Sequence, residues 1–172
     1  VTLNWIVSSY MLSTSILLLP AGRIGDIMGR KKIFTAGLIS FTLTMILLTF
    51  TPGIRGRIGV RVLQGVGSAM LFGTNMAILT SVFPPGERGR AMGINVTAVY
   101  IGLASGPFLG GILTRYLGWR SIFAFLIPMG IISLILIRTK MKEEWAEAHG
   151  EKFDWPGAAI YGLSMAAIMY GF

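Results

Sequence analysis

The segment Gly93–Gly111, GINVTAVYIGLASGPFLGG, is apolar and carries glycine at a regular interval. Gly102, Gly106 and Gly110 recur at every fourth residue, which places them on one slowly drifting face of an α-helix. Pro107 lacks a backbone donor and crowds the preceding turn, so we expect the helix to bend at this point. Such a helix is weak in water, but in a bilayer its smooth face allows another helix to pack with its backbone very close.

The composition of the chain is that of a polytopic membrane protein. Its 172 residues are 53% hydrophobic and 13% charged, with a mean hydropathy of +0.71, values outside the range of ordinary soluble domains. The net charge is +8, but the basic residues are spread over short segments without a nucleic-acid-reading motif, so we expect no nucleic-acid partner. The chain has no cysteine and one histidine, His149; we therefore expect no metal site, and no other cofactor.

Apolar windows long enough to cross a hydrocarbon core of about 30 Å predict five spans and a shorter sixth. We expect residues 1–137 to form a helical bundle, 138–155 a cytoplasmic connector and 156–172 the start of another span. The sequence begins and ends within apolar runs, so we treat it as a piece of a longer protein. The expected spans are 3–21, 33–51, 58–82, 91–114, 119–137 and 156–172.

The loops predict the orientation, because Lys and Arg collect on the cytoplasmic side of a membrane. Ten basic residues lie on one side of the predicted spans and five on the other, and all seven acidic residues share the side with ten. We expect that side to be cytoplasmic. Its basic residues are Arg23, Arg30, Lys31, Lys32, Arg88, Arg90, Arg138, Lys140, Lys142 and Lys152.

The longest polar stretch is KMKEEWAEAHGEKFD, residues 140–154. Glu143, Glu144 and Glu147 lie among helix-forming residues, which predicts a short helix that ends near Gly150. This segment is either a docking element or a solvated connector, and we take the solvated connector as the expectation. His149 is then an exposed loop histidine rather than a proton relay.

Asp26 is the single carboxylate in the basic segment 22–32, between the first two predicted spans. The glycines around it permit a tight reversal. Asp26 can accept hydrogen bonds from neighbouring arginines or from a helix N-terminus, and such bonds would break if the helices tilted apart. A conformational latch is one interpretation, and an ordinary hairpin of basic residues is the other.

This segment resembles the motif between the second and third helices of the major facilitator superfamily of secondary transporters. The match covers Gly22, Asp26, Gly29, Arg30 and Lys31. The resemblance implies that these residues form a cytoplasmic gating loop. Ile27 stands where the family usually has a basic residue, so that part of the family's charge network is not expected here.

Arg61 lies in the third predicted span and is followed by Gln64, Gly65 and Gly67. An ionisable side chain within a span is costly and therefore functional by default, although snorkelling to the interface is an alternative. The stretch is similar to the superfamily's fourth-helix motif. The resemblance implies that Arg61, with Gln64 one turn on, takes part in proton coupling.

The opening stretch is the third similarity. Its spaced positions reproduce the superfamily's fifth-helix antiporter pattern, which implies export by exchange and a helix that lies between the two halves of the transporter. The positions are Gly93, Gly102, Gly106, Pro107, Gly110 and Gly111. Close helix packing alone would also explain glycines at this spacing.

Further stretches, such as FDWPG at 153–157, resemble the drug:proton antiporters with fourteen spans. By this resemblance the spans are helices two to six and part of the seventh. The first helix, with its acidic residue, and the second bundle would belong to the rest of a parent transporter. Those helices are the partners that we expect for this chain.

A cavity for apolar or cationic drugs would use aromatic and methionine surface with few polar groups. The weak candidates for lining it are Tyr10, Met11, Asn75 and Tyr100, and beyond these Trp5, Met76, Asn95 and Phe108. Each of them could equally serve helix packing or face lipid.

The sequence therefore predicts an all-α membrane protein, the N-terminal helical bundle of a major facilitator transporter without its first helix. We expect it to belong to a multi-pass exporter of the plasma membrane that exchanges small amphipathic molecules for protons by alternating access. A metabolite importer of the same superfamily is the nearest alternative, and a non-transporting membrane fragment is another. An enzyme is not expected.

Overall fold

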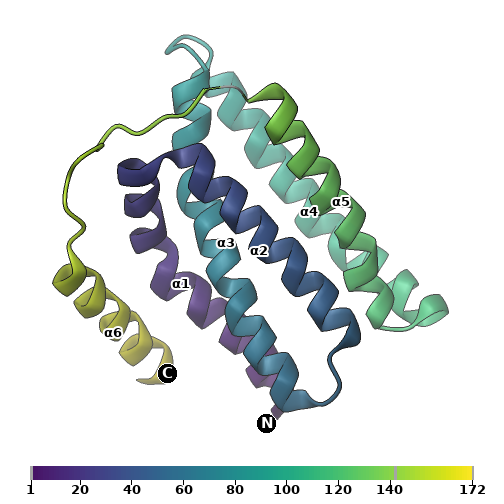
Figure 1. Ribbon diagram of the computed structural model, residues 1–172. Coiled ribbons are helices and arrows are strands. Elements are labelled where there is room, and N and C mark those ends of the chain that lie inside the picture. Colours follow the sequence, from purple (N-terminus) through teal and green to yellow (C-terminus); the bar gives the residue numbers. More distant parts are fainter. Residues whose placement is uncertain (1, 142, 172) are drawn as a thin grey trace.

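The computed structural model describes residues 2–141 and 143–171, and these residues form six α-helices without a strand (Figure 1). Five of the helices are long and apolar enough to cross a membrane, and the sixth is a shorter apolar helix. The expected all-helical bundle with five spans and a partial sixth is therefore confirmed. The helices are α1 (Thr2–Met28), α2 (Arg30–Phe50), α3 (Ile54–Val82), α4 (Arg88–Leu117), α5 (Arg120–Lys140) and α6 (Trp155–Gly171).

The helices extend beyond the expected apolar windows at most of their ends. The largest difference is at α1, which continues to Met28 although the expected span ends at residue 21. Apolar windows mark the hydrocarbon-crossing part of a helix, whereas polar residues at the interface can continue the same hydrogen-bonded ladder. The expected loop 22–32 is thus largely helical, and the reversal occurs at Gly29, with φ 115° and ψ 122°.

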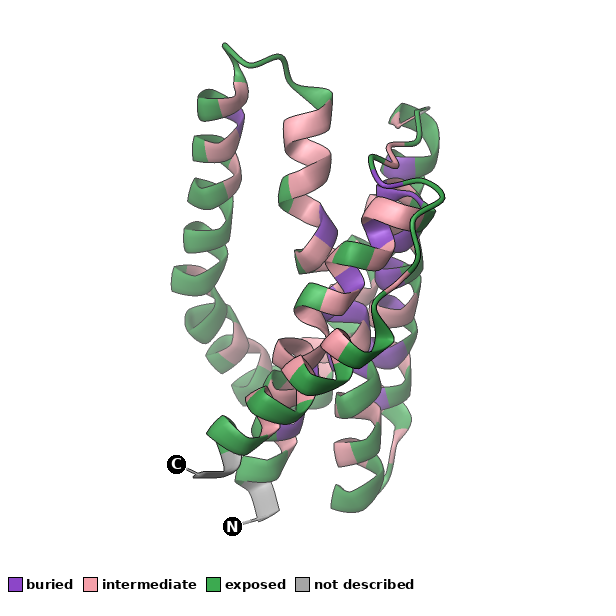
Figure 2. Cartoon of the chain, turned by 90° about the vertical axis from the view of Figure 1, so that its left-hand side faces the viewer, coloured by how far each residue is buried: buried purple, intermediate pink, exposed green. Residues whose placement is uncertain are grey.

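The core of the molecule lies between α1, α2 and α3. Figure 2 shows the buried residues concentrated in this part of the chain and a long, almost entirely exposed helix beside it. That helix is α4, in which Ala91 is the one buried residue. α5 packs on α2, α6 packs on α1, and α4 touches α3 and α5 only slightly. The bundle therefore has a packed centre and one helix whose surface is mostly free.

Glycines bring helix backbones together in this core. A Cβ built on Gly73 would lie 2.8 Å from the backbone oxygen of Leu18 and 2.9 Å from the nitrogen of Gly22, so α1 and α3 meet there without side chains between them. α2 and α3 meet in the same way, because a Cβ on Gly37 would lie 2.9 Å from the oxygen of Gly67.

The glycines of α4 are not in such contacts. A Cβ on Gly93, Gly102, Gly106 or Gly111 would meet no atom within 4 Å, and one on Gly110 would meet only Ile122 Cδ1, at 4.0 Å. The described helices thus leave the glycine face of α4 open, and close backbone packing among them occurs at other glycines. The packing expected of the α4 glycines stays a prediction. Pro107 lies inside α4, which continues past it to Leu117; the bend at this point stays a prediction.

Gly73→Ala is expected to destabilise the bundle by about 1–3 kcal/mol, because a methyl group there would push α1 away from α3. Gly59→Ala is the matched control, since Gly59 lies in the same helix and has no atom within 4 Å of a built Cβ. The measurement is the thermal denaturation midpoint of the full-length protein in detergent. Equal midpoints for the two variants would contradict the close approach.

Candidate functional site

Gly29 joins α1 directly to α2 and so places Asp26 and Arg30 one turn apart on either side of the reversal. Arg30 Nε donates a hydrogen bond to Asp26 Oδ1 at 2.7 Å. The Arg30 side chain is only 7% exposed, whereas that of Asp26 is 30% exposed. A guanidinium buried to this degree needs several acceptors.

Arg30 finds those acceptors in two further parts of the chain. Its Nη1 and Nη2 donate to the two carboxylate oxygens of Glu147, each at 2.8 Å. Nη1 also donates to Ser81 Oγ at 2.7 Å and to the backbone oxygen of Ala77 at 3.4 Å. Bidentate pairs of this kind are among the stronger hydrogen bonds in proteins. One side chain on α2 therefore connects the end of α1, the end of α3 and the connector between α5 and α6.

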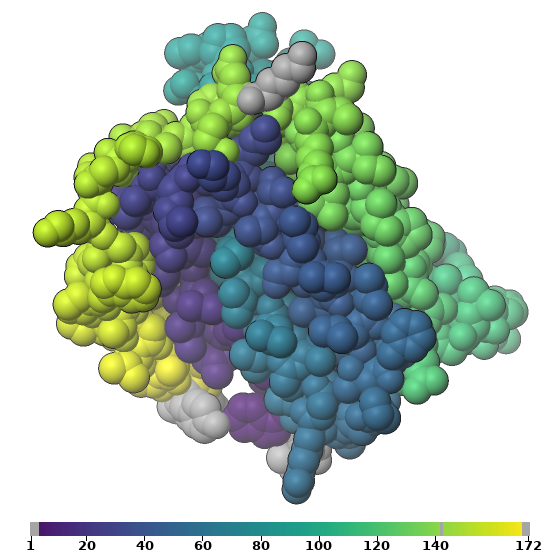
Figure 3. Space-filling view, in the orientation of Figure 1, coloured from purple at the N-terminus to yellow at the C-terminus, as the bar shows by residue number. Residues whose placement is uncertain are grey.

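The backbone of the connector is also docked on the α1–α2 junction. Arg30 N donates to the oxygen of Trp145 at 2.8 Å, and Ala148 N donates to the oxygen of Asp26 at 3.0 Å. Glu144 Oε1 accepts from the backbone nitrogens of Lys31 and Lys32 at 2.9 and 3.3 Å. Figure 3 shows the connector, in yellow-green, lying across this junction.

Two expectations for this segment are wrong. Residues 143–150 form no helix but an irregular stretch followed by turns, because Glu144 and Glu147 bond to the α1–α2 junction. The segment is also not simply a solvated connector, since its backbone and side chains bind the junction. The chain does turn at Gly150, which has φ 89°.

The pKa of Glu147 is lowered, first by its hydrogen bonds from Arg30 and then by the positive charge of that guanidinium; Arg88 adds a weaker attraction. A carboxyl group whose pKa is lowered in the docked state stabilises docking above its undocked pKa, about 4.3, and stops doing so as the pH falls through the lowered value. At neutral pH Glu147 is therefore ionised and stabilises docking of the connector on the α1–α2 junction.

Glu147→Gln is expected to loosen the connector at neutral pH, because it removes the negative charge that Arg30 binds. Acid should loosen the connector of the unsubstituted protein in the same way, by protonating Glu147. The chain has no cysteine, so a single His149→Cys position can carry a spin label whose mobility reports docking. Glu143→Gln is the matched control, because Glu143 is exposed and forms no hydrogen bond or ion pair within the described part of the chain. Equal label mobility in both variants would contradict a holding role for Glu147.

The second group of predicted residues lies in α3. Arg61 Nη1 donates to Gln64 Oε1 at 2.8 Å, and Gln64 is 1% exposed. The Arg61 guanidinium also lies 5.3 Å from the ring centre of Phe123 and 5.8 Å from that of Tyr10. Its Nε is buried without a hydrogen-bond partner among the described residues. Arg61 therefore reaches into the bundle and does not snorkel outward.

The four weak substrate-cavity residues do not gather at one place. Tyr10 lies by Arg61 and shares a 2.9 Å hydrogen bond with Ser68. Asn75 donates to Asn95 at 3.4 Å and lines an apolar cavity of about 440 Å³ between α2, α3 and α5. Met11 and Tyr100 are 53% and 67% exposed on α1 and α4. Their role in substrate binding stays a prediction.

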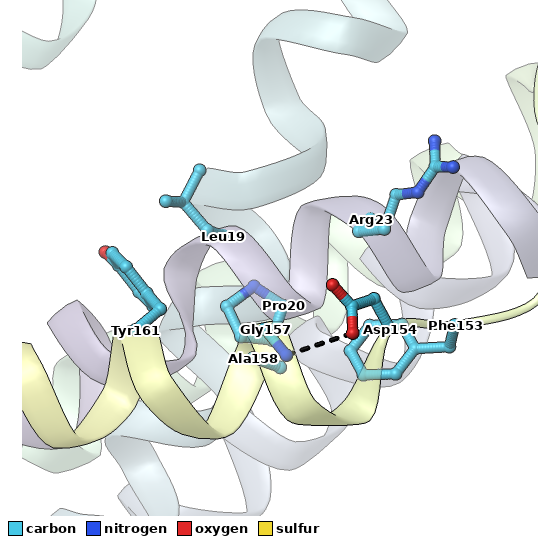
Figure 4. A pocket seen from close by; sticks show the side chains of 8 residues that line it. All are labelled: Leu19, Pro20, Arg23, Phe153, Asp154, Gly157, Ala158 and Tyr161. Atoms are coloured by element: carbon cyan, nitrogen blue, oxygen red, sulfur yellow. Dashed lines mark hydrogen bonds between the residues drawn. The ribbon is translucent and has the colours of Figure 1, made fainter.

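A further cavity, of about 320 Å³, lies between α1 and α6 (Figure 4). Leu19, Pro20 and Arg23 line it from α1, and Tyr161 faces them from α6. Asp154 caps α6 by accepting a hydrogen bond from Gly157 N at 3.0 Å. The cavity lies where α1 and α6 pack together. Its charged groups, Arg23 and Asp154, are at one end.

The sequence predicted Asp26, Arg30, Arg61 and Gln64 but missed Ser81, Glu144 and Glu147. Asp26 with Arg30 and Arg61 with Gln64 are local pairs, four and three residues apart. Ser81 and Glu147 are 51 and 117 residues from Arg30. The signal available in the sequence was the cluster of glutamates in segment 143–147. Nothing in the sequence paired it with Arg30, which is 117 residues away from Glu147.

Several transporters are similar to this chain over nearly its whole length. The chain is 33% identical to the riboflavin transporter RibZ of Clostridioides difficile over 167 residues, which are 97% of the chain and 37% of that protein. It is 34% identical over 169 residues to the multidrug resistance protein Stp of Mycobacterium tuberculosis, covering 98% of the chain and 31% of Stp. It is 34% identical over 175 residues to the cephamycin export protein CmcT of Amycolatopsis lactamdurans, covering 99% of the chain and 35% of CmcT.

The chain thus spans about a third of the length of these curated relatives. The family model of the Major Facilitator Superfamily matches residues 1–172. Both results agree with the five helices that are long and apolar enough to cross a membrane. The chain therefore belongs to the Major Facilitator Superfamily, a family of transporters rather than enzymes, and is a multi-pass membrane protein of the plasma membrane.

Proposed function

We propose that this chain is part of an exporter of drugs or other small amphipathic molecules that is driven by proton antiport. The observation that carries the proposal is the Arg61–Gln64 pair, an arginine held inside the bundle by a buried glutamine. Relatives named for multidrug resistance and for cephamycin export support the direction of transport. The partners are then the substrate, protons, the lipid bilayer and the remaining helices of the parent transporter.

In this mechanism Arg61 is a fixed positive charge at the coupling site. A buried cation favours the ionised form of any carboxylate nearby and so favours release of its proton. The carboxylate itself is proposed to lie in the remaining helices of the parent. Arg61 then makes proton release and substrate exchange depend on each other, because moving the bundle changes the distance between the two charges.

The cytoplasmic gate is assigned to Gly22, Asp26, Gly29, Arg30 and Lys31. Arg30 carries this role, because its side chain already links three helix ends and the connector. A latch of this kind holds one arrangement of the helices and breaks in the other, so it sets which side of the membrane is open. The connector contributes through Glu147.

The open glycine face of α4 is assigned to the contact with the second half of the transporter. Gly106→Leu should leave the stability of the described helices unchanged, because no atom lies within 4 Å of a Cβ there, yet it should impair exchange by blocking close packing in the parent. Gly89→Leu is the control, since Gly89 is equally free in α4. Full exchange by Gly106→Leu would remove this assignment.

The experiment that tests the proposal is efflux by the full-length parent reconstituted in proteoliposomes. An imposed proton gradient should drive a fluorescent cationic drug against its own gradient, and the drug should in turn drive protons the opposite way. Transport that is indifferent to the proton gradient would overturn antiport.

Uptake of a metabolite is the second candidate function. The similarity to a protein named as a riboflavin transporter favours it. The same proteoliposomes decide between the two, because an importer would accumulate riboflavin when the gradient points inward and would leave the drug where it was.

A further inference from the structure

A groove of about 410 Å³ lies between the start of α2 and the end of α5, which lie side by side in Figure 1. In Figure 3 the same two helices, blue and green, face the viewer together. Lys31 is shared with the proposed gate, and the other side chains that line the groove are not among the proposed gate and coupling residues. Its lining residues are Lys31, Lys32, Thr35, Ala36, Ile39, Arg138 and Glu144.

The groove holds more positive than negative charge. Three of its lining residues are cations and one, Glu144, is a carboxylate. Glu144 is already bound by the backbone nitrogens of Lys31 and Lys32. Within the described part of the chain, the side chains of Lys31, Lys32 and Arg138 form no ion pair. They are therefore available to an anion from outside the protein.

Beyond the lining cations, exposed apolar residues continue along both helices. Ala36, Ile39 and Leu43 follow Lys32 on one face of α2 at helical spacing, and all three are exposed. Ile135 and Ile131 precede Arg138 on one face of α5 in the same way and are 56% and 47% exposed. Both helices are long and apolar enough to cross a membrane. Each cationic end thus continues into an apolar stripe that runs along a spanning helix.

We infer that this groove binds an anionic glycerophospholipid. Its phosphate would lie among Lys31, Lys32 and Arg138, and its acyl chains would lie along the apolar stripes of α2 and α5. A basic pocket between spanning helices is suited to anionic head groups. A soluble phosphate or an acidic peptide would match the cations alone and leave the apolar part of the groove uncovered, so the lipid is the occupant that fits both parts.

The test is native mass spectrometry of the full-length protein with phosphatidylglycerol or phosphatidylcholine. The wild-type protein should retain phosphatidylglycerol in preference to phosphatidylcholine. Lys32→Gln combined with Arg138→Gln should weaken retention of phosphatidylglycerol roughly tenfold, since each basic residue near the surface contributes to the attraction. Both residues lie outside the proposed gate and coupling residues, so the result does not depend on transport.

Arg90→Gln combined with Lys152→Gln is the matched control, because it removes the same charges from exposed positions that do not line the groove. This variant should retain phosphatidylglycerol as the wild type does. Equal retention of the two lipids by the wild type, or equal loss in both double variants, would overturn the site.

A second measurement does not depend on a variant. Glycerol phosphate carries the head-group anion without acyl chains, and an excess of it should fail to displace phosphatidylglycerol from the wild-type protein. Displacement at comparable concentrations would show that the groove takes a free anion and would overturn the lipid assignment.

Discussion

Arg61→Ala is expected to reduce proton-driven efflux by the full-length protein to the level of vesicles without protein. The substitution removes the cation that the proposed coupling requires, and it leaves the oxygen of the buried Gln64 without its 2.8 Å donor. An unsatisfied buried acceptor costs about 1–3 kcal/mol. The protein should therefore insert and purify normally but with a lower denaturation midpoint.

Two further variants separate coupling from charge and from stability. Arg55→Ala removes an exposed arginine at the same end of α3 and should leave efflux unchanged. Arg61→Lys keeps the charge but loses the planar donor group that meets Gln64 and the two aromatic rings, so it should transport slowly rather than not at all. Normal efflux by Arg61→Ala would end the coupling assignment.

Arg30→Ala is expected to have the second-largest effect, a loss of roughly 3 kcal/mol of stability together with a leaky cytoplasmic gate. Arg30 is 6% exposed, and its removal takes hydrogen bonds from Asp26, Ser81 and Glu147 at once, along with the packing of its stem. Glu147→Ala should cost far less, because the Glu147 side chain is 70% exposed and water can take the place of its carboxylate as the acceptor for Arg30.

This asymmetry can be measured by a double-mutant cycle on Arg30 and Glu147, with the denaturation midpoint and passive substrate leak as readouts. Arg30→Lys should recover less than half of the lost stability, since an ammonium group cannot bind Glu147 through two nitrogens and Asp26 through a third. Equal losses for Arg30→Ala and Glu147→Ala would show that Arg30 acts only through the connector.

The sequence predicted the helices well because hydropathy over about 20 residues reports a length that the bilayer imposes. It predicted their ends less well: segment 22–32 carries three glycines and several charges, which read as a loop, yet α1 continues to Met28. Charged residues at the membrane interface do not end a helix when its backbone hydrogen bonds can continue, as they do in α1. The turn occurs at Gly29, which has a positive φ. The sequence alone did not indicate which of the three glycines in this segment would make the turn.

The candidate site was predictable only where its residues are local. Arg61 and Gln64 are three residues apart on one helix, so their contact follows from helical geometry. Docking of the connector depends on Glu147 meeting Arg30 from 117 residues away, and nothing in the local pattern distinguishes such a glutamate from a solvated one. The glycines of α4 show the opposite difficulty, because their spacing is regular but no described helix packs closely against them.

Only Gly29 separates α1 from α2, so the connection cannot absorb an added or a deleted residue. One residue added inside a helix rotates everything beyond it by about 100°, which at Arg30 would carry the guanidinium away from Asp26, Ser81 and Glu147 together. Insertions and deletions should therefore be rejected at this junction across a library of random variants, whereas the five-residue connection 83–87 between α3 and α4 should accept them.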